Sequence, residues 1–249
     1  MIDALYVRYS LRQKDSLDPR YKPEQAIVDR QFLNPGADKL AVIFPGWHNR
    51  SKQFPISRVI KRLQRKGWAV LVYDFHDQVL QANDETVVES FRFIRDTIAD
   101  DLEKVQSGKN YSEIRLISIS MGMVMLGLVA DKYSHFTSTT VVVGGDNLAI
   151  DMWHGMRTKI YADEFRKIHI GIRKLTHDWN ELAPVNHLRH FKDKPIKFVM
   201  GTRDEFVLTK YQEKLLSNLL DAGAKVKVKK HHGGHVFTIV LFALFDSPL

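Results

Sequence analysis

A serine at a sharp strand-to-helix turn is the feature of this sequence best suited to chemistry. The apolar run Glu113–Ser118 predicts a buried strand, and Met123–Ala130 predicts a buried helix. Between them stand Ser120 and Gly122, which puts the serine at the apex of a tight turn. Such a turn holds the hydroxyl clear of the sheet, and it frees the N–H of Met121 at a helix N-terminus to bind a developing oxyanion. The pattern favours nucleophilic catalysis by Ser120.

The five-residue pattern alone leaves an ordinary strand–helix turn open as the alternative. A nucleophile elbow usually reads G-x-S-x-G, whereas this chain reads Ser118-x-Ser120-x-Gly122. Serine is small, so the close approach of strand and helix can survive the change. A serine hydroxyl also needs a base beside it, and that partner must come from another part of the chain.

Length and composition restrict the class of protein. The chain of 249 residues fits one α/β domain with a modest insertion. It has no cysteine, which excludes disulfides, thiolate zinc sites and cysteine nucleophiles, and which fits a cytoplasmic location. The N-terminal residues lack the pattern of a signal peptide, and no apolar run reaches transmembrane length, so we expect no stable membrane insertion. The net charge of +8 suits acidic partners or an anionic surface.

Strands and helices alternate along the chain. The predicted strands are Leu5–Leu11, Gln25–Phe32, Leu40–Phe44, Trp68–Tyr73, Glu113–Ser118, Thr139–Val143, Pro195–Met200 and Lys225–Lys229. Continuous apolar strands are typical of a parallel sheet covered on both faces, whereas the alternating lysines of the last run are typical of an exposed edge. Residues 148–190 mix helical stretches, aromatic and basic residues without a strand. The sequence predicts a mostly parallel, doubly wound α/β sheet with an insertion.

From Leu40 to His235 the sequence resembles the α/β-hydrolases. The likeness is strongest in Leu182–Leu188 and in Pro195–Val207, which are similar to the family's approach to its catalytic acid. The resemblance implies a single α/β-hydrolase domain over 1–249, with 148–190 as a small cap or lid. It also implies the chain order nucleophile, acid, histidine, each placed after a strand at the carboxyl edge of the sheet.

Ser120, Asp204 and His235 match that order. By this resemblance Ser120 attacks an acyl carbon, His235 transfers the proton, and Asp204 orients the imidazole. Asp146 also ends a predicted strand and stays open as an alternative acid. Asp74 ends another strand and is interpreted as a residue that fixes a loop.

The same resemblance implies an oxyanion hole made by the backbone N–H groups of Trp47 and Met121. Members of the family often have His-Gly before the first of these positions, where this chain has Pro45-Gly46, but a backbone donor does not depend on that side chain. Substrate contacts are expected from His48, Trp153 and Met156, with solvent exposure as the alternative for His48 and packing of the cap onto the sheet as the alternative for the other two.

The function indicated is a serine acyl hydrolase that cleaves a carboxylic ester or an acyl thioester. The stretch Val143–Asp151 is faintly similar to bacterial acyl-thioester hydrolases. A non-catalytic hydrolase-fold binding protein and a small-substrate serine peptidase are the alternatives. The histidines lack metal-site spacing, so we expect no metal and no other cofactor. No phosphate-binding loop or nucleic-acid motif is present, so we expect no nucleic-acid partner. The oligomeric state stays open.

Overall fold

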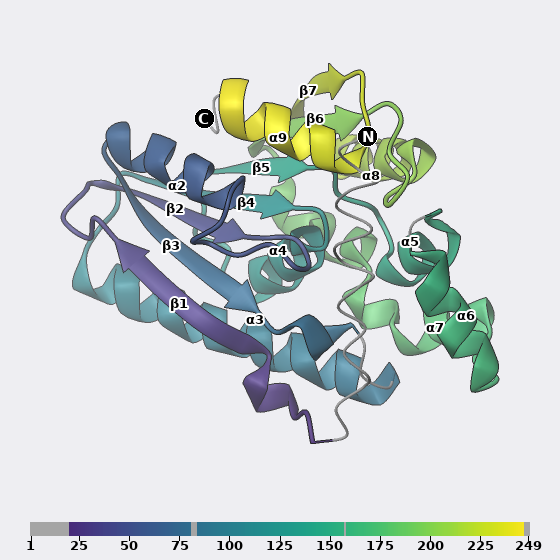
Figure 1. Cartoon of the computed structure of the whole chain (residues 1–249). Coiled ribbons are helices and arrows are strands. Elements are labelled where there is room, and N and C mark those ends of the chain that lie inside the picture. Colours follow the sequence, from purple (N-terminus) through teal and green to yellow (C-terminus); the bar gives the residue numbers. More distant parts are fainter. Residues whose placement is uncertain (1–19, 81–83, 157, 247–249) are drawn as a thin grey trace.

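A seven-stranded sheet forms the centre of the computed structural model, which describes residues 20–80, 84–156 and 158–246 (Figure 1). Its strands lie in the order β1-β3-β2-β4-β5-β6-β7, with β1 antiparallel to β3 and the other described pairs parallel. The bounds are β1 Ile27–Leu33, β2 Lys39–Phe44, β3 Trp68–Phe75, β4 Glu113–Ile119, β5 Ser138–Val142, β6 Pro195–Gly201 and β7 Lys225–His231. The mostly parallel sheet predicted from the sequence is confirmed. The strand expected over Leu5–Leu11 lies outside the described residues.

The central strands are apolar on both faces because each face is covered by helices. In β2, Leu40, Val42 and Phe44 belong to one core cluster. Ala41 and Ile43, which point the opposite way, belong to the other. The same alternation recurs in β3 and β4, so the sheet separates two hydrophobic cores. A strand buried on both faces gains hydrophobic stabilisation at every position, which explains the unbroken apolar runs in the sequence.

Two sets of helices make these layers. The described α-helices are α2 Ile56–Arg65, α3 Asp84–Gly108, α4 Gly122–Lys132, α5 Leu148–His154, α6 Lys159–Lys167, α7 Ile172–Asp178, α8 Thr209–Asp221 and α9 His235–Phe245. The 3-10 helices are η1 Pro23–Gln25, η2 Asp77–Val79, η3 Asn180–Leu182 and η4 Pro184–Phe191. Helices α2 and α9 cover one face of the sheet, and α3, α4 and α8 cover the other (Figure 1). Arg62 of α2 donates to the carbonyl oxygens of Phe242 and Ala243, which ties α2 to the end of α9.

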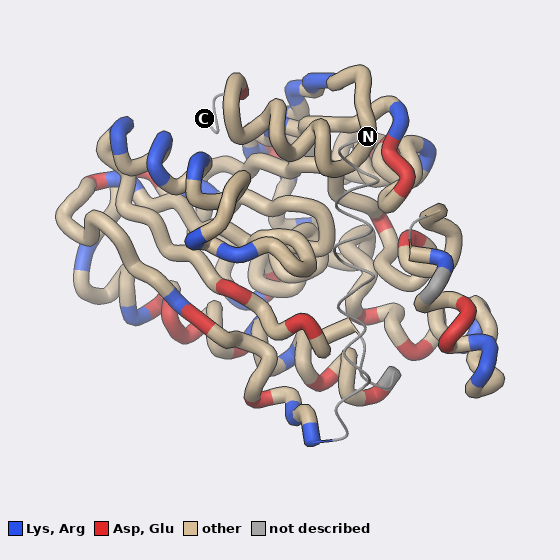
Figure 2. Tube along the Cα trace, viewed as in Figure 1, with Lys and Arg blue, Asp and Glu red and all other residues tan. Residues whose placement is uncertain are grey.

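The cationic side chains gather on the outside of this frame. Figure 2 shows Lys and Arg spaced along the outer side of α2, and the lysines of β7 are exposed at the edge of the sheet. An exposed edge strand lined with lysine resists pairing with another chain, because each added strand would bring like charges together. The edge position predicted for Lys225–Lys229 is confirmed.

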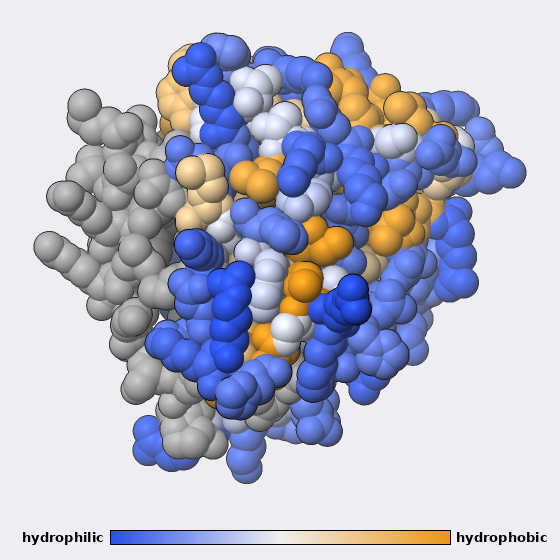
Figure 3. All heavy atoms as spheres, turned by 90° about the vertical axis from the view of Figure 1, so that its right-hand side faces the viewer, coloured by the Kyte–Doolittle hydropathy of each residue, from blue (hydrophilic) through white to orange (hydrophobic). Residues whose placement is uncertain are grey.

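The segment 148–190 contributes α5, α6, α7 and η3 beyond the carboxyl ends of the central strands (Figure 1). The face of the molecule that carries these helices shows apolar side chains between hydrophilic ones (Figure 3). Met156 and Ile168 are exposed apolar residues of this segment. No described helix has both the length and the apolar character required to cross a membrane.

A buried carboxylate fixes the C-terminal end of α9 against β7. Asp246 is buried, accepts a hydrogen bond from Lys229, and lies 2.8 Å from His231 Nε2. Burial alone would raise the pKa of Asp246, but the contacts with Lys229 and His231 hold this pKa below its ordinary value. The carboxylate thus stabilises the fold wherever it is ionised.

We expect Asp246→Asn to lower the free energy of unfolding by about 2 kcal/mol near neutral pH, because a buried charge-assisted contact is lost. Because the pKa of Asp246 is lowered in the folded state, the stability difference between the native protein and the variant is fully present above the ordinary carboxyl pKa of about 4. This difference disappears as the pH falls through the pKa of Asp246 in the folded protein. Urea denaturation of both proteins at several pH values measures it. Asp193→Asn is the matched control, because Asp193 is exposed and its Lys225 contact is 3.7 Å long. A constant difference down to strong acid would contradict the assignment.

Candidate active site

The turn between β4 and α4 places Ser120 in a backbone conformation that L-residues rarely adopt. Its φ is +54°, in the left-handed region. The N–H of Ser120 donates to the carbonyl of Val142 at 2.8 Å, and its own carbonyl accepts from Met123 N at 3.0 Å. These bonds hold the strained residue between the end of β5 and the first turn of α4. The result is a serine presented at the carboxyl edge of the sheet, as the sequence predicted.

Gly122 makes this turn possible. A Cβ atom on Gly122 would stand 2.0 Å from the carbonyl oxygen of Phe44, so α4 begins in direct backbone contact with the end of β2. Ser118, which replaces the glycine usual at the start of such elbows, is fully buried. Its hydroxyl points to Met123 Sδ at 3.8 Å, a weak contact that the small side chain can make inside the core. The departure from the usual pattern leaves the turn intact.

The three residues singled out as nucleophile, base and acid are joined by hydrogen bonds. Ser120 Oγ lies 2.9 Å from His235 Nε2. Asp204 Oδ2 lies 2.7 Å from His235 Nδ1. The histidine is the first residue of α9, and its ring packs on Phe206 with centroids 5.0 Å apart. The arrangement lets a proton pass from the hydroxyl to the imidazole while the carboxylate holds the ring.

Asp204 is fixed by further donors. Its Oδ1 accepts from the backbone N–H groups of Phe206 and Val207 at 2.9 and 3.0 Å. Its Oδ2 accepts from Gln212 Nε2 at 2.9 Å, and the same amide nitrogen donates to the carbonyl of Val207. Gln212 is fully buried on α8 and was not recognised from the sequence, because a glutamine in an amphipathic helix has no distinguishing spacing.

Asp146, the alternative acid, has a different partner. It is fully buried, and its Oδ2 lies 2.6 Å from Lys214 Nζ of α8. The hydrogen bond of His235 Nδ1 goes to Asp204. The geometry supports Asp204 as the orienting carboxylate. Asp74, interpreted as a loop-fixing residue, accepts from the backbone N–H and hydroxyl of Ser51 at 2.6 and 2.9 Å, which agrees with that interpretation.

The loop after β2 carries Trp47 at the wall of the same site. The indole Nε1 donates to the carbonyl of Asp77 at 2.9 Å, and Asn49 Nδ2 donates to the carbonyl of Trp47 at 3.2 Å. Within the described part of the chain, neither the N–H of Trp47 nor that of Met121 has a hydrogen-bond acceptor. Both N–H groups are therefore available to a bound ligand.

His48 lies beside this loop and faces a carboxylate. Its ring stacks on Trp47 with centroids 4.4 Å apart, and Nδ1 is 3.0 Å from Asp77 Oδ1, an ion-pair distance without hydrogen-bond alignment. Arg50 donates to the same oxygen at 2.6 Å. Burial would raise the pKa of Asp77, but His48 and Arg50 hold it below its ordinary value. An ionised Asp77 can thus fix the loop.

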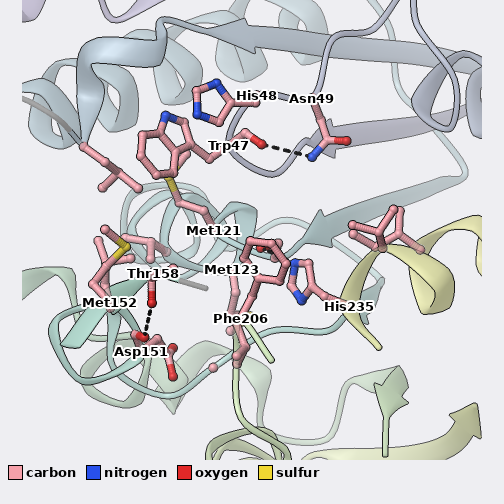
Figure 4. Close-up of a pocket in the computed structure, with 18 of the residues that line it drawn as sticks. Trp47, His48, Asn49, Met121, Met123, Asp151, Met152, Thr158, Phe206 and His235 are labelled. Carbon is pink, nitrogen blue, oxygen red and sulfur yellow. Dashed lines mark hydrogen bonds between the residues drawn. The ribbon is translucent and has the colours of Figure 1, made fainter. Parts of the chain in front are cut away.

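A cavity of about 560 Å³ opens in front of Ser120 and His235 (Figure 4). Its wall is mostly apolar and comes from the loop after β2, from α4 and α9, and from the 148–190 segment. Leu148, Asp151, Met152, Thr158 and Tyr161 are the lining residues from that segment. A site of this size and polarity can hold a small apolar group next to the serine.

Trp153 and Met156, expected to contact substrate, are not among the described residues that line this cavity. Helix periodicity explains the difference for Trp153: Leu148, Asp151 and Met152 share the face of α5 toward the cavity, and Trp153 lies one step round the helix. There its ring packs under the guanidinium of Arg166, 4.5 Å away. Met156 follows the helix and is 69% exposed. Of the three proposed contacts, His48 alone lines the cavity.

The chemistry available here is that of side chains and backbone groups. Within the described residues, no three or more His, Cys, Asp or Glu side chains are grouped so as to hold a metal ion. The arrangement combines a hydroxyl beside an imidazole with a carboxylate behind it. Such a set can support acyl transfer through a covalent intermediate.

Comparison with solved structures shows the fold. No protein-family model matches the chain, and the search of curated proteins finds no match. The esterase Pf2001 of Pyrococcus furiosus is similar with a TM-score of 0.62 and 17% identity over 86% of this chain and 80% of that one. An acetyl xylan esterase from Paenibacillus sp. R4 gives a TM-score of 0.63 and 14% identity over 81% and 70%. The acylaminoacyl peptidase of Pyrococcus horikoshii gives 0.62 and 14% over 85% of this chain and 34% of that one. The chain has the α/β-hydrolase fold.

The close approach at the elbow can be tested by adding one methyl group. We expect Gly122→Ala to lower the free energy of unfolding by about 3 kcal/mol, because its Cβ would meet the Phe44 carbonyl oxygen at 2.0 Å and force two backbones apart. Chemical denaturation gives the value. Gly36→Ala is the matched control, since a Cβ there has no atom within 4 Å, and it should change stability by less than about 0.5 kcal/mol. Equal stability of the two variants would show that the turn tolerates a side chain.

Proposed function

We propose that this protein is a serine acyl hydrolase that cleaves a carboxylic ester or an acyl thioester. The observation that carries the proposal is the continuous hydrogen-bonded chain from Ser120 through His235 to Asp204 at the wall of an apolar cavity. A binding protein has no need of this alignment, whereas covalent catalysis requires all three groups within hydrogen-bond reach. The names of the similar structures, two esterases and a peptidase, support hydrolysis of an acyl bond.

The proposed reaction has two halves. In the first, Ser120 Oγ attacks the acyl carbon while His235 Nε2 accepts the hydroxyl proton. The N–H groups of Trp47 and Met121 stabilise the oxyanion, and His235 then gives its proton to the leaving alcohol or thiol. In the second half a water, activated by His235, releases the acid and restores Ser120. Asp204 keeps the imidazole in the required tautomer throughout, because Nδ1 donates to its Oδ2.

The cavity indicates where the acyl group would lie. Leu148, Met152 and Met123 present apolar surface beside the serine. Tyr161 of α6 meets Trp47 across the site, with ring centroids 4.8 Å apart. We infer that 148–190 acts as a cap that covers the acyl part of the substrate. Each methylene buried there contributes roughly 0.8 kcal/mol, enough to favour an acyl chain that fills the cavity.

A reactive-serine probe tests the nucleophile. We expect a fluorophosphonate to label the native protein at Ser120, because an imidazole 2.9 Å away activates its hydroxyl. Ser120→Ala should abolish both labelling and hydrolysis of p-nitrophenyl esters. Mass spectrometry of the labelled peptide identifies the site. Ser118→Ala, two residues away and buried, is the matched control and should keep labelling. Labelling that persists in Ser120→Ala would refute the assignment, and absence of labelling in the native protein would favour a binding role.

A pair of carboxylate variants tests the acid. We expect Asp204→Asn to reduce kcat by about 10⁴-fold, because an amide in place of the carboxylate no longer holds the imidazole in the productive tautomer. Asp146→Asn should cost far less, since the Asp146 carboxylate pairs with Lys214 and not with His235. Circular dichroism checks that both variants fold, and steady-state ester hydrolysis gives kcat. The reverse order of effects would move the acid to the end of β5.

A further inference from the structure

One carboxylate in the cavity wall has no role in the proposed reaction. Asp151 of α5 is 92% buried, being only 8% exposed, and it lines the same cavity as Ser120 and His235 (Figure 4). Its Oδ1 has no hydrogen-bond partner in the described part of the chain. A buried carboxylate without a donor is costly, because it gives up hydration and receives nothing in return. A ligand that supplies a donor would offset this cost.

The fold holds this carboxylate in place through the backbone of α5. Asn147 caps the helix by accepting from Ile150 N at 3.1 Å, and its carbonyl accepts from Asp151 N at 2.9 Å. The carbonyl of Asp151 accepts from Gly155 N at 2.9 Å and from the hydroxyl of Thr158 at 3.1 Å. Both backbone groups of the residue are therefore bonded, and Oδ1 of its side chain is left without a partner in the described part of the chain.

Gly145 makes room for the carboxylate. A Cβ on Gly145 would stand 1.8 Å from Asp151 Oδ2, so no other residue fits there with this side chain in place. Gly145 also lines the cavity, so Asp151 Oδ2 lies against a residue of the cavity wall. The carboxylate thus packs against the backbone of Gly145, and Leu148 and Met152 flank it on the same face of α5.

Among the described residues around Asp151, carboxylates outnumber cations. Asp146 after β5 and Asp204 after β6 raise its pKa further than burial alone, and Lys214 of α8 lowers it. Lys214 forms its ion pair with Asp146 at 2.6 Å, and Asp204 faces His235. Within the described part of the chain, three carboxylates therefore share one lysine and one histidine. An added positive charge would be bound favourably here.

We propose that Asp151 is a specificity residue that binds a primary ammonium group carried on the acyl part of the substrate. The proposal rests on the serine hydrolase function, because the acyl chain must enter this cavity from Ser120. The methylene groups of such a chain contact Leu148, Met152 and Met123, and the ammonium reaches the carboxylate. An ammonium supplies both the missing charge and three donors, whereas a hydroxyl supplies one donor and leaves the charge uncompensated.

The test compares esters that differ only in their far end. p-Nitrophenyl esters of ω-amino acids from propanoate to octanoate are measured beside equally long esters that end in a methyl or a hydroxyl group. At one chain length we expect kcat/KM for the amino ester to exceed that of the methyl ester by about tenfold or more, as a charge-assisted hydrogen bond implies. In Asp151→Asn, a change of nearly equal size, this preference should be lost while the methyl ester is still cleaved. Asp163→Asn on the exposed side of α6 is the matched control and should keep the preference.

The pH dependence has a definite sign. Asp151 must be ionised to pair with an ammonium, and its raised pKa means that this occurs at higher pH than for an ordinary carboxyl. The ratio of kcat/KM for amino and methyl esters should therefore rise as the pH increases through that pKa. Taking the ratio cancels the titration of the triad, which acts on both esters alike.

The outcomes separate the inference from the function it rests on. Equal rates for amino and methyl esters at every length would overturn the role of Asp151 and leave the hydrolase intact. The proposal would also be overturned if the hydroxyl ester and the amino ester had equal kcat/KM and if the ratio of kcat/KM for amino and methyl esters did not change with pH. That result would mean that the site binds a neutral donor. If no ester is cleaved, the proposed function fails, and a binding measurement then tests the inference. We expect calorimetry to detect binding of hexylammonium to the Ser120→Ala protein. Adding Asp151→Asn to that protein should abolish the binding.

A stability measurement gives a readout that a purely structural role would not produce. A carboxylate whose only purpose is packing should destabilise the protein when it is replaced. We expect Asp151→Asn to raise Tm instead, because it removes an unsatisfied buried acid. A lower Tm together with an unchanged amino-ester preference would assign Asp151 to the fold.

Discussion

The contact between Gly122 and the carbonyl of Phe44 governs the geometry of the whole site. Because α4 starts against the end of β2, the chain must reverse within two residues of β4, and Ser120 takes up the strain at φ +54°. The same closeness brings the loop after β2, with Trp47, next to the serine. One backbone contact in the interior thus positions both Ser120 and Trp47. Their precision depends on a rigid, doubly covered sheet and not on the surface loops.

Three buried carboxylates near the serine differ in function because they differ in their donors. Asp204 receives two backbone N–H groups, an amide from Gln212 and the histidine, which fixes both oxygens. Asp146 pairs with Lys214 and joins α8 to the end of β5. Asp151 is buried like the other two, but its Oδ1 has no hydrogen-bond partner and its carboxylate forms no ion pair within the described residues. Charge alone would not distinguish them. The contacts of each carboxylate do distinguish them: hydrogen bonds surround Asp204, an ion pair with Lys214 holds Asp146, and Asp151 has neither within the described residues.

Much of this arrangement could be predicted from the sequence because it depends on local rules. Continuous apolar runs gave the buried parallel strands, alternating lysines gave the edge at β7, and placement at strand ends brought Ser120, Asp204 and His235 to one edge of the sheet. The direction of the side chains on α5 was not predicted, because Trp153 was expected to contact substrate and does not line the cavity. The apolar content of the segment was apparent, but the helix phase that turns Met152 inward and Trp153 toward Arg166 depends on where α5 begins, and that is set by the Asn147 cap.

The loop after β2 shows how a departure from a family pattern can be absorbed. Its donor is a backbone N–H, so the identity of the residue before Gly46 matters less than the rigidity of the loop. That rigidity comes from groups distant in sequence: the Trp47 indole bonds to the carbonyl of Asp77, whose carboxylate is held by Arg50. Trp47 also meets Tyr161 of the insertion. A movement of α6 would therefore change the packing around Trp47, whose backbone N–H is the proposed oxyanion donor. In the proposed reaction, this contact would couple the fit of the acyl group under Tyr161 to the stabilisation of the transition state.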